Sequence, residues 1–347
     1  MKSNPFTLTF GREPINYIPR PYYFIEVENS FLSETRPNQA YMITGVRGSG
    51  KTVLLTTLSK KFNELKDWIV IDINPERDML ESFASKLYNS SKTKHLFVKL
   101  GLSLSFGGVG LAIENDKPSE DIETTIDKMM DYLTKNGEKV LITIDDATNN
   151  SYIKSFSHMF QSLIRKDYSV FLLMTGLYEN ISSIQNNKAL TFLARIPRLI
   201  MKPLNLVAIK DSYRDIFETS DEDSVKMAKL TNGYAYAYQL LGYLFWEKKD
   251  KSIDKKLLKD YDVYLAELVY DRLWDSLPEQ EQLIIKSISK DCHTGLIMEE
   301  TNINEKQLSV YRDRLIKRGL VVSKKRGELS FTLPRFKEYV DNKELFV

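Results

Sequence analysis

Cysteine and histidine are scarce in this sequence. The single cysteine, Cys292, has no partner for an intramolecular disulfide, which fits a reducing compartment. The three histidines, His95, His158 and His293, are scattered along the chain and show no zinc-binding spacing. An excess of one charge is missing as well. The formal net charge is +2, so the overall balance does not require a nucleic acid or a membrane surface as partner.

No apolar run is long enough to span a bilayer. The longest, Gly233–Trp246, has 14 residues and contains Gln239, whereas a spanning helix needs about 20 apolar residues. The first residues lack the apolar centre of a signal peptide and include Pro5. We therefore expect a cytoplasmic protein that has no membrane partner. The aromatic residues of Gly233–Trp246 are interpreted as helical core packing.

What the sequence does contain is an ordinary globular composition over 347 residues, which corresponds to two or three domains. Three continuous apolar runs, Trp68–Ile73, Lys139–Ile144 and Val170–Thr175, alternate with segments of helical period. Strands that are apolar throughout are typical of a parallel sheet covered on both faces. The expected parts are an N-terminal segment over 1–37, an α/β core over 38–204 with a β-hairpin insertion at about 98–114, a helical region over 205–275 and a distinct module over 276–347.

A glycine-rich loop follows the short apolar run AYMIT. It matches the pattern G-x-x-x-x-G-K-[ST] and opens a segment of helical period. The glycines let successive backbone N–H groups turn around a phosphate, and the following helix adds the positive end of its dipole. Lys51 is expected to reach the β- and γ-phosphates, and Thr52 to ligate Mg²⁺. The candidate nucleotide-binding residues of this segment are Gly45, Val46, Arg47, Gly48, Ser49, Gly50, Lys51, Thr52 and Val53.

Two carboxylates, Asp145 and Asp146, follow the run Lys139–Ile144. At the carboxyl edge of a parallel sheet, Asp145 is placed to join the metal shell, and Asp146 to position or deprotonate an attacking water. Thr175 ends the next strand at the same edge. Its hydroxyl either senses the γ-phosphate and orients the water, or belongs to an ordinary strand-end threonine.

Two arginines, Arg195 and Arg198, flank a short predicted strand. An arginine at the γ-phosphate stabilises the charge of the transition state, either within one chain or across a subunit interface. The alternative is a pair of surface arginines in a loop. Of the two we favour Arg195 as the catalytic candidate.

These features together resemble the archaeal-type ATPases of the AAA+/STAND branch of P-loop NTPases. The matching stretches are the N-terminal box NPFTLTFGRE, the glycine loop, the strand ending in Asp145-Asp146, the FLLMTG strand, the downstream arginine and the lid-like stretch Thr231–Gly242. The resemblance implies an α/β fold of the P-loop NTPase, AAA+-like class, with a parallel sheet, a helical lid and a C-terminal winged-helix domain. It also implies ATP and Mg²⁺ as ligands.

The resemblance assigns roles to the matching residues. Lys51, Thr52, Asp145 and Asp146 take the phosphate and metal roles, Thr175 the sensor role and Arg195 the possible finger role. The box around Phe10 and Arg12 resembles the family's adenine-side element, with an ordinary N-terminal turn as the alternative.

The sequence departs from the family pattern at three places. Asp146 stands where many members have Glu, and its shorter arm favours slow hydrolysis. Three prolines within Pro14–Pro21 oppose the helix that relatives start there, although Ile18 could still cover the base. The lid stretch reads Gly233-Tyr-Ala235, without the proline that STAND members tend to carry.

The C-terminal module has the order of a winged helix-turn-helix, ending in two strands around a basic turn. Residues 305–347 contain eleven Lys/Arg and six Asp/Glu, so this region is basic within a near-neutral chain. Basic residues on the second helix and the wing are what phosphate contact requires. Winged helices also serve as protein-contact modules, so duplex DNA and a protein both remain open as partners. The candidate DNA contacts are Arg312, Arg318, Lys324, Lys325 and Arg326.

We expect an ATPase that acts as a molecular switch and couples its nucleotide state to the winged-helix module. The alternative is a nucleotide-regulated binding module with little intrinsic hydrolysis. A third possibility is an ATPase that is active only as a homo-oligomer, with its arginine acting in trans. No base-specific motif excludes GTP.

Overall fold

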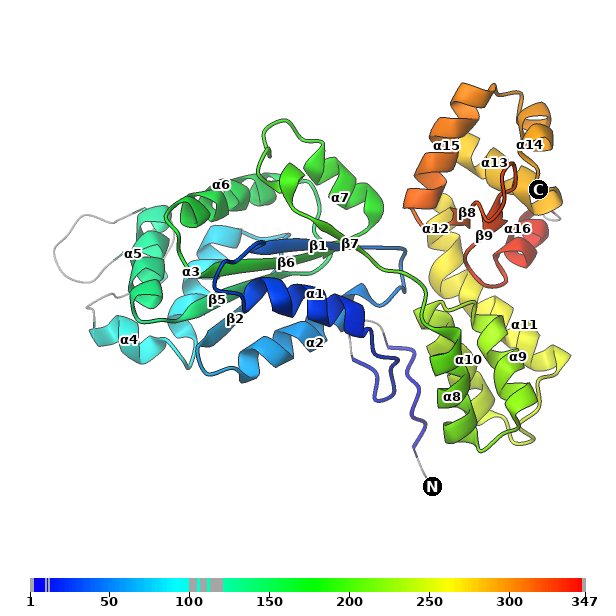
Figure 1. Ribbon diagram of the computed structural model, residues 1–347, viewed down its shortest axis with the longest axis horizontal. Coiled ribbons are helices and arrows are strands. Elements are labelled where there is room, and N and C mark those ends of the chain that lie inside the picture. The colour runs from blue at the N-terminus through cyan, green and yellow to red at the C-terminus, as the bar shows by residue number, and fades with distance from the viewer. Residues whose placement is uncertain are drawn as a thin grey trace. The chain divides into compact units, whose positions relative to one another are not determined.

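The computed structural model describes residues 3–9, 11, 13–99, 105–106, 111–112 and 121–344. The chain forms two compact units (Figure 1). The sheet unit comprises Pro21–Thr44 and Lys51–Ile200. The helical unit comprises Met1–Arg20, Gly45–Gly50 and Met201–Val347.

A five-stranded parallel sheet forms the centre of the sheet unit, in the order β2-β5-β6-β1-β7. Strand β6 lies between β1, which leads into the glycine loop, and β5, which leads to Asp145. All five strands therefore end at one edge, with Thr44 opposite Gly176 and Ile144 opposite Met174. The strands are β1 (Ala40–Thr44), β2 (Trp68–Ile73), β5 (Lys139–Ile144), β6 (Val170–Gly176) and β7 (Arg198–Ile200).

Helices cover both faces of this sheet, which is why its strands are mostly apolar. Helices α1 (Pro21–Phe31) and α2 (Lys51–Glu64) cover one face, where Phe31, Phe62 and Phe171 surround Trp68. The ring centroids of Phe62 and Trp68 are 4.4 Å apart. The other face is covered by α3 (Met79–Asn89), α5 (Ile122–Lys135), α6 (Ser151–Arg165) and α7 (Tyr178–Gln185) (Figure 1).

The segment between α3 and α5 contains short elements. Helix α4 (Lys94–Lys99) is followed by β3 (Ser105–Phe106) and β4 (Leu111–Ala112), which pair antiparallel. Both strands lie within the range of the predicted hairpin, whereas α4 overlaps its predicted start. The remaining predicted hairpin residues, 100–104, 107–110 and 113–114, lie outside the described residues.

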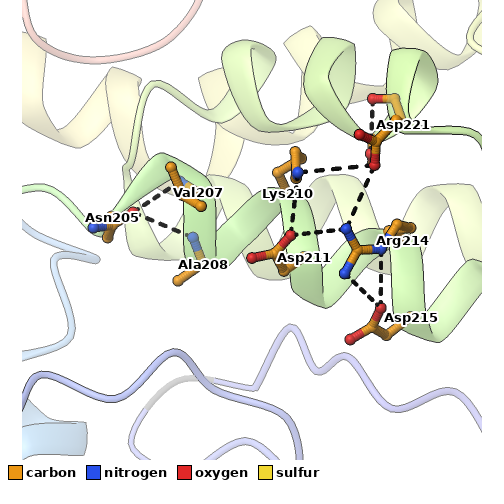
Figure 2. Close-up of polar contacts among 9 residues, drawn as sticks. Asn205, Val207, Ala208, Lys210, Asp211, Arg214, Asp215 and Asp221 are labelled. Atoms are coloured by element: carbon orange, nitrogen blue, oxygen red, sulfur yellow. Dashed lines mark hydrogen bonds and ion pairs between the residues drawn. The ribbon is translucent and has the colours of Figure 1, made fainter.

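Four helices of the helical unit follow β7: α8 (Leu206–Phe217), α9 (Asp221–Thr231), α10 (Ala235–Glu247) and α11 (Lys255–Leu265). Figure 2 shows how α8 meets α9 through a surface cluster of charges. Lys210 and Arg214 both reach Asp221, at 3.8 and 3.5 Å. Arg214 also pairs with Asp211 at 3.1 Å and with Asp215 at 3.2 Å. Such exposed pairs orient helices but contribute little stability.

Aromatic side chains form the core of these helices, as the sequence predicted for Gly233–Trp246. Tyr213, Tyr238 and Phe245 are fully buried, and Phe6 of the N-terminal segment packs among them. The approach of Phe6 requires a glycine, because a Cβ on Gly242 would lie 2.5 Å from its ring. The predicted N-terminal segment over 1–37 is therefore divided, with Phe6 in the helical core and α1 in the sheet unit.

Within the predicted helical region over 205–275, regular α-helix is interrupted after α11. A π-helical turn, η2 (Ala266–Tyr270), separates α11 from α12 (Asp271–Asp275). The C-terminal region then has a winged-helix-like order, with three helices, a short antiparallel pair and a last helix. These are α13 (Glu279–Lys290), α14 (Thr294–Thr301), α15 (Glu305–Lys317), β8 (Val321–Val322), β9 (Ser330–Phe331) and α16 (Phe336–Glu344). Among the described residues, no helix combines the length and the apolar character needed to cross a bilayer.

Candidate nucleotide-binding site

The glycine loop connects β1 to α2 in a conformation that depends on its glycines. Gly48 and Gly50 have φ of +73° and +93°, a backbone region that side chains disfavour. A Cβ on Gly45 would lie 2.9 Å from the Met201 Cβ, so this position also requires a glycine. Helix α2 begins at Lys51, which is 7% exposed, and Val53 is half-buried in its first turn.

Asp145 is held by two threonines within the sheet unit. The Thr52 hydroxyl donates to its Oδ2 at 2.9 Å, and the Thr175 hydroxyl donates to its Oδ1. The Thr175 Oγ1 also accepts the Asp146 backbone N–H at 3.1 Å and is fully buried. The structure thus brings together the three residues that the sequence assigned to the metal and sensor positions.

Asp146 turns the chain out of the sheet. Its φ is +53°, a left-handed conformation that aspartate tolerates better than most residues. The next backbone N–H, that of Ala147, donates to the Thr175 carbonyl at 2.8 Å and closes this turn. The Asp146 side chain is exposed at the carboxyl end of β5, where it is accessible to water.

The donor set around Asp145 fits a magnesium ion. A carboxylate and a hydroxyl lie 2.9 Å apart, and both are hard oxygen ligands of the kind that Mg²⁺ prefers. In the loop, the Ser49 Oγ is buried and makes no hydrogen bond to the described part of the protein. These features agree with a site that receives phosphate oxygens and a cation.

A second group of metal-ligand types occurs at Asp291, Cys292 and His293, whose ligand atoms lie within 4.8 Å of one another. The sequence analysis did not anticipate this group. Its closeness has a local cause, because the His293 Nδ1 and backbone N–H each lie 2.7 Å from the Asp291 Oδ1 just before α14. We assign no metal to it.

The two candidate arginines differ in their surroundings. Arg198 is half-buried, contacts Gln185 and Ser182 through its guanidinium and lies over the ring of Tyr178 at 5.4 Å. Arg195 ends a short 3₁₀ turn, η1 (Leu193–Arg195), and is exposed. The Arg198 side chain therefore has its contacts with residues of α7, within the sheet unit.

The proposed adenine-side residues are placed only in part. Phe10 and Arg12 lie outside the described residues. Ile18 is half-buried and packs against the core of the helical unit. Nothing in its contacts identifies a base-binding surface.

The basic residues of the C-terminal region fall into two groups. Arg312, Lys324, Lys325 and Arg326 are exposed on α15 and on the turn between β8 and β9. Arg318 is directed inward instead, since its Nη1 lies 3.3 Å from Oε2 of the fully buried Glu281. We therefore remove Arg318 from the candidate DNA contacts.

Sequence reasoning missed the residues that donate hydrogen bonds to the backbone carbonyls of the glycine loop. Arg20, Tyr234 and Tyr236, all of the helical unit, bond to its backbone. The only sequence signal was the position of the two tyrosines at the start of the lid-like stretch. No pattern links either of them to the loop.

Two known domain families match parts of this chain. A family of ATPase domains found predominantly in Archaea matches residues 29–190, and a domain family of unknown function (DUF8462) matches residues 267–340. No curated protein matches the sequence.

Several solved structures share the fold. A Walker-type ATPase of Pyrococcus abyssi superposes with a TM-score of 0.61 at 14% identity, over 91% of this chain and 95% of that one. The ORC2 protein of Aeropyrum pernix, in ADPNP-ADP complexes, gives 0.57 at 15% identity over 96% and 97%. Cdc6p of Pyrobaculum aerophilum gives 0.51 at 14% identity over 97% and 98%. At such identities the likeness establishes the fold alone.

Proposed function

We propose that the chain is a P-loop ATPase of the AAA+ class that binds ATP with Mg²⁺ and hydrolyses it as a molecular switch. The proposal is supported by the match of residues 29–190 to a family of ATPase domains found predominantly in Archaea. The observation that carries the proposal is that Asp145 accepts hydrogen bonds from both Thr52 and Thr175. Thr52 is the last residue of the phosphate-binding pattern. Asp145 and Thr52 would supply two protein oxygen ligands to a nucleotide-bound magnesium, and phosphate oxygens and waters would complete its shell.

Each residue of the site has a defined task in this proposal. The loop N–H groups and Lys51 neutralise the phosphates, and Thr52 and Asp145 hold the metal. When bound, Mg²⁺ supplies positive charge to the phosphate oxygens. Asp146 positions the attacking water, and Thr175 keeps the Asp145 carboxylate oriented while bonding the Asp146 backbone. An arginine would complete the charge stabilisation, and Arg195 is the exposed candidate.

The second candidate function is a nucleotide-regulated binding module with little intrinsic hydrolysis. It is favoured by Asp146, whose side chain is one methylene shorter than the glutamate of many relatives. The exposure of Arg195 is compatible with a role in a neighbouring subunit of a homo-oligomer. Turnover by the isolated protein, measured over a range of concentrations, separates these cases.

The C-terminal region supplies the output of the proposed switch. Its exposed basic residues on α15 and the β8–β9 turn support duplex DNA as the partner, with a protein as the alternative. The function needs a compartment that contains ATP, in agreement with the cytoplasmic location expected from the sequence.

The proposal predicts that Lys51→Ala weakens nucleotide binding about 10- to 100-fold, the effect of losing one charge-assisted bond to phosphate. The measurement is a calorimetric titration with ADP and with ATP, which gives the dissociation constant of each. Lys60→Ala, an exposed lysine on the same helix, is the matched control and should bind like wild type. Equal affinities of Lys51→Ala and wild type would refute the assignment of the site.

A further inference from the structure

Three consecutive carbonyl groups of the glycine loop accept hydrogen bonds from the rest of the helical unit. The Tyr234 hydroxyl donates to the Arg47 carbonyl at 2.5 Å. The Tyr236 backbone N–H donates to the Gly48 carbonyl at 3.0 Å. The Arg20 Nη2 donates to the Ser49 carbonyl at 2.9 Å. The loop is thus bonded along its outer side by the first turn of α10 and by the N-terminal segment.

The fit between α10 and the loop is close. A Cβ on Gly48 would lie 2.2 Å from the Tyr234 hydroxyl oxygen and 2.9 Å from the Tyr236 Cβ, so only glycine allows this approach. Tyr234 is 5% exposed and Tyr236 is 6% exposed. Burial raises the pKa of Tyr234 above its ordinary value, so its hydroxyl stays protonated and remains a donor at alkaline as well as at neutral pH.

These bonds constrain the opposite side of the loop as well. In a trans peptide the carbonyl and the following N–H point in opposite directions. A carbonyl fixed outward therefore fixes the next N–H toward the inner side, where a phosphate would bind. The bonds to Arg47 and Ser49 orient the N–H groups of Gly48 and Gly50 in this way. The Ser49 N–H is engaged in a turn with the Val46 carbonyl at 3.2 Å.

We infer that Tyr234 is a positioning residue of the nucleotide site: its hydroxyl holds the glycine loop in the phosphate-binding conformation and ties that conformation to helix α10. The inference rests on the proposed function, because it assumes that the loop binds nucleotide. It adds a direct mechanical link between the loop and the lid. If the contact of Tyr234 with the loop strengthens nucleotide binding by a given free energy, then bound nucleotide must strengthen that contact by the same free energy.

A second contact extends this link to the winged-helix-like region. Gly319, in the turn between α15 and β8, has a φ of +75°, and a Cβ there would lie 3.2 Å from the Val46 Cγ1. The loop is therefore within van der Waals reach of the region that carries the proposed output. A change in the loop can reach that region through packing alone.

The test is Tyr234→Phe, which removes only the hydroxyl. We expect the dissociation constant for ADP to rise about 3- to 10-fold, the range for one neutral hydrogen bond. We also expect faster amide hydrogen exchange across residues 45–50 in the nucleotide-free protein. The exchange measurement does not depend on nucleotide binding, so it reports the state of the loop directly.

The matched control is Tyr261→Phe. Tyr261 is fully buried in the same helical core, and its hydroxyl donates to the Leu230 carbonyl at 3.1 Å, an acceptor outside the loop. It should lower the melting temperature to a similar degree but leave both ADP affinity and loop exchange at wild-type values. Thermal melts of both variants show that they are folded.

Two results would overturn the inference. One is a Tyr234→Phe variant with wild-type affinity and wild-type loop exchange. The other is tighter nucleotide binding, which would mean that α10 restrains the loop against its ligand. If wild type fails to bind ADP, or Lys51→Ala binds it equally well, the proposed function fails instead, and the exchange data still decide whether Tyr234 holds the loop.

Discussion

At the scale of single residues, the site combines positions that sequence reasoning can find with positions that it cannot. Asp145 and Thr175 were predictable because each ends a buried strand, and parallel strands deliver their last residues to one edge. Tyr234 and Arg20 were not, because they meet the loop through tertiary contacts between distant segments. Hydrophobic period predicts that α10 is a helix, but not what its first turn touches.

Arg318 is a residue that the sequence assigned to DNA and that the structure places in an internal ion pair. Its charge and its place at the end of α15 suggested a phosphate contact. The buried carboxylate of Glu281, on another helix, gives it an internal partner instead. A sequence shows the charge of a side chain, but its partner is decided by packing.

Thr175→Val should lower the turnover number while leaving nucleotide affinity nearly unchanged. The substitution keeps the shape of the side chain but removes the hydroxyl that bonds Asp145 and the Asp146 N–H. Loss of a hydrogen bond to a charged group corresponds to roughly a 10- to 100-fold effect. The measurement is steady-state phosphate release together with an ADP titration.

Thr143→Val provides the control for this prediction. Thr143 is buried in β5, and its hydroxyl bonds the Asp72 carboxylate at 3.1 Å and not a candidate site residue. If this variant lost as much turnover as Thr175→Val, the effect would be one of sheet stability and Thr175 would have no specific role.

At the scale of elements, continuous apolar runs were the most reliable signal. Strands β2 and β5 have the bounds predicted for them, because both faces of a central parallel strand are buried and its ends are marked by polar residues. Helix α7 was missed, since only Ile181 and Ile184 of its side chains are buried. Eight residues are too few to show the helical repeat of apolar positions. The π-turn η2 was missed because the helical repeat of apolar positions continues through it without a break in the sequence.

The β8–β9 turn is the element that tests DNA as the partner. Lys324, Lys325 and Arg326 are exposed there, so replacing all three by alanine should weaken duplex binding at every sequence. If each contacts one phosphate, the negative slope of log K against log salt should become shallower by about 2.7. The measurement is fluorescence anisotropy of a labelled duplex at several salt concentrations.

A second triple variant controls for the loss of three charges. Lys255, Lys256 and Lys259 are exposed on α11, and their replacement by alanine removes the same charge from the same unit. An equal loss of affinity in both variants would indicate non-specific attraction. Absence of duplex binding by wild type would favour a protein partner.

At the scale of the whole molecule, the two compact units are not contiguous in sequence. The N-terminal segment joins the helical unit through Phe6, and the glycine loop joins it through the bonds to its carbonyls. Composition shifts along a sequence cannot reveal such exchanges, because they depend on contacts between distant segments. The arrangement connects the proposed nucleotide site to the region that carries the proposed output.

The most direct test of the account is steady-state phosphate release from ATP across a range of protein concentrations, with Mg²⁺ or with EDTA, for wild type and Asp145→Asn. Asp145→Asn removes the charge that, in the proposal, helps to hold the metal. We predict turnover by wild type that requires Mg²⁺ and is lost in the variant. Turnover that persists in Asp145→Asn, or no turnover at any concentration despite tight ATP binding, would contradict an ATPase that uses this site.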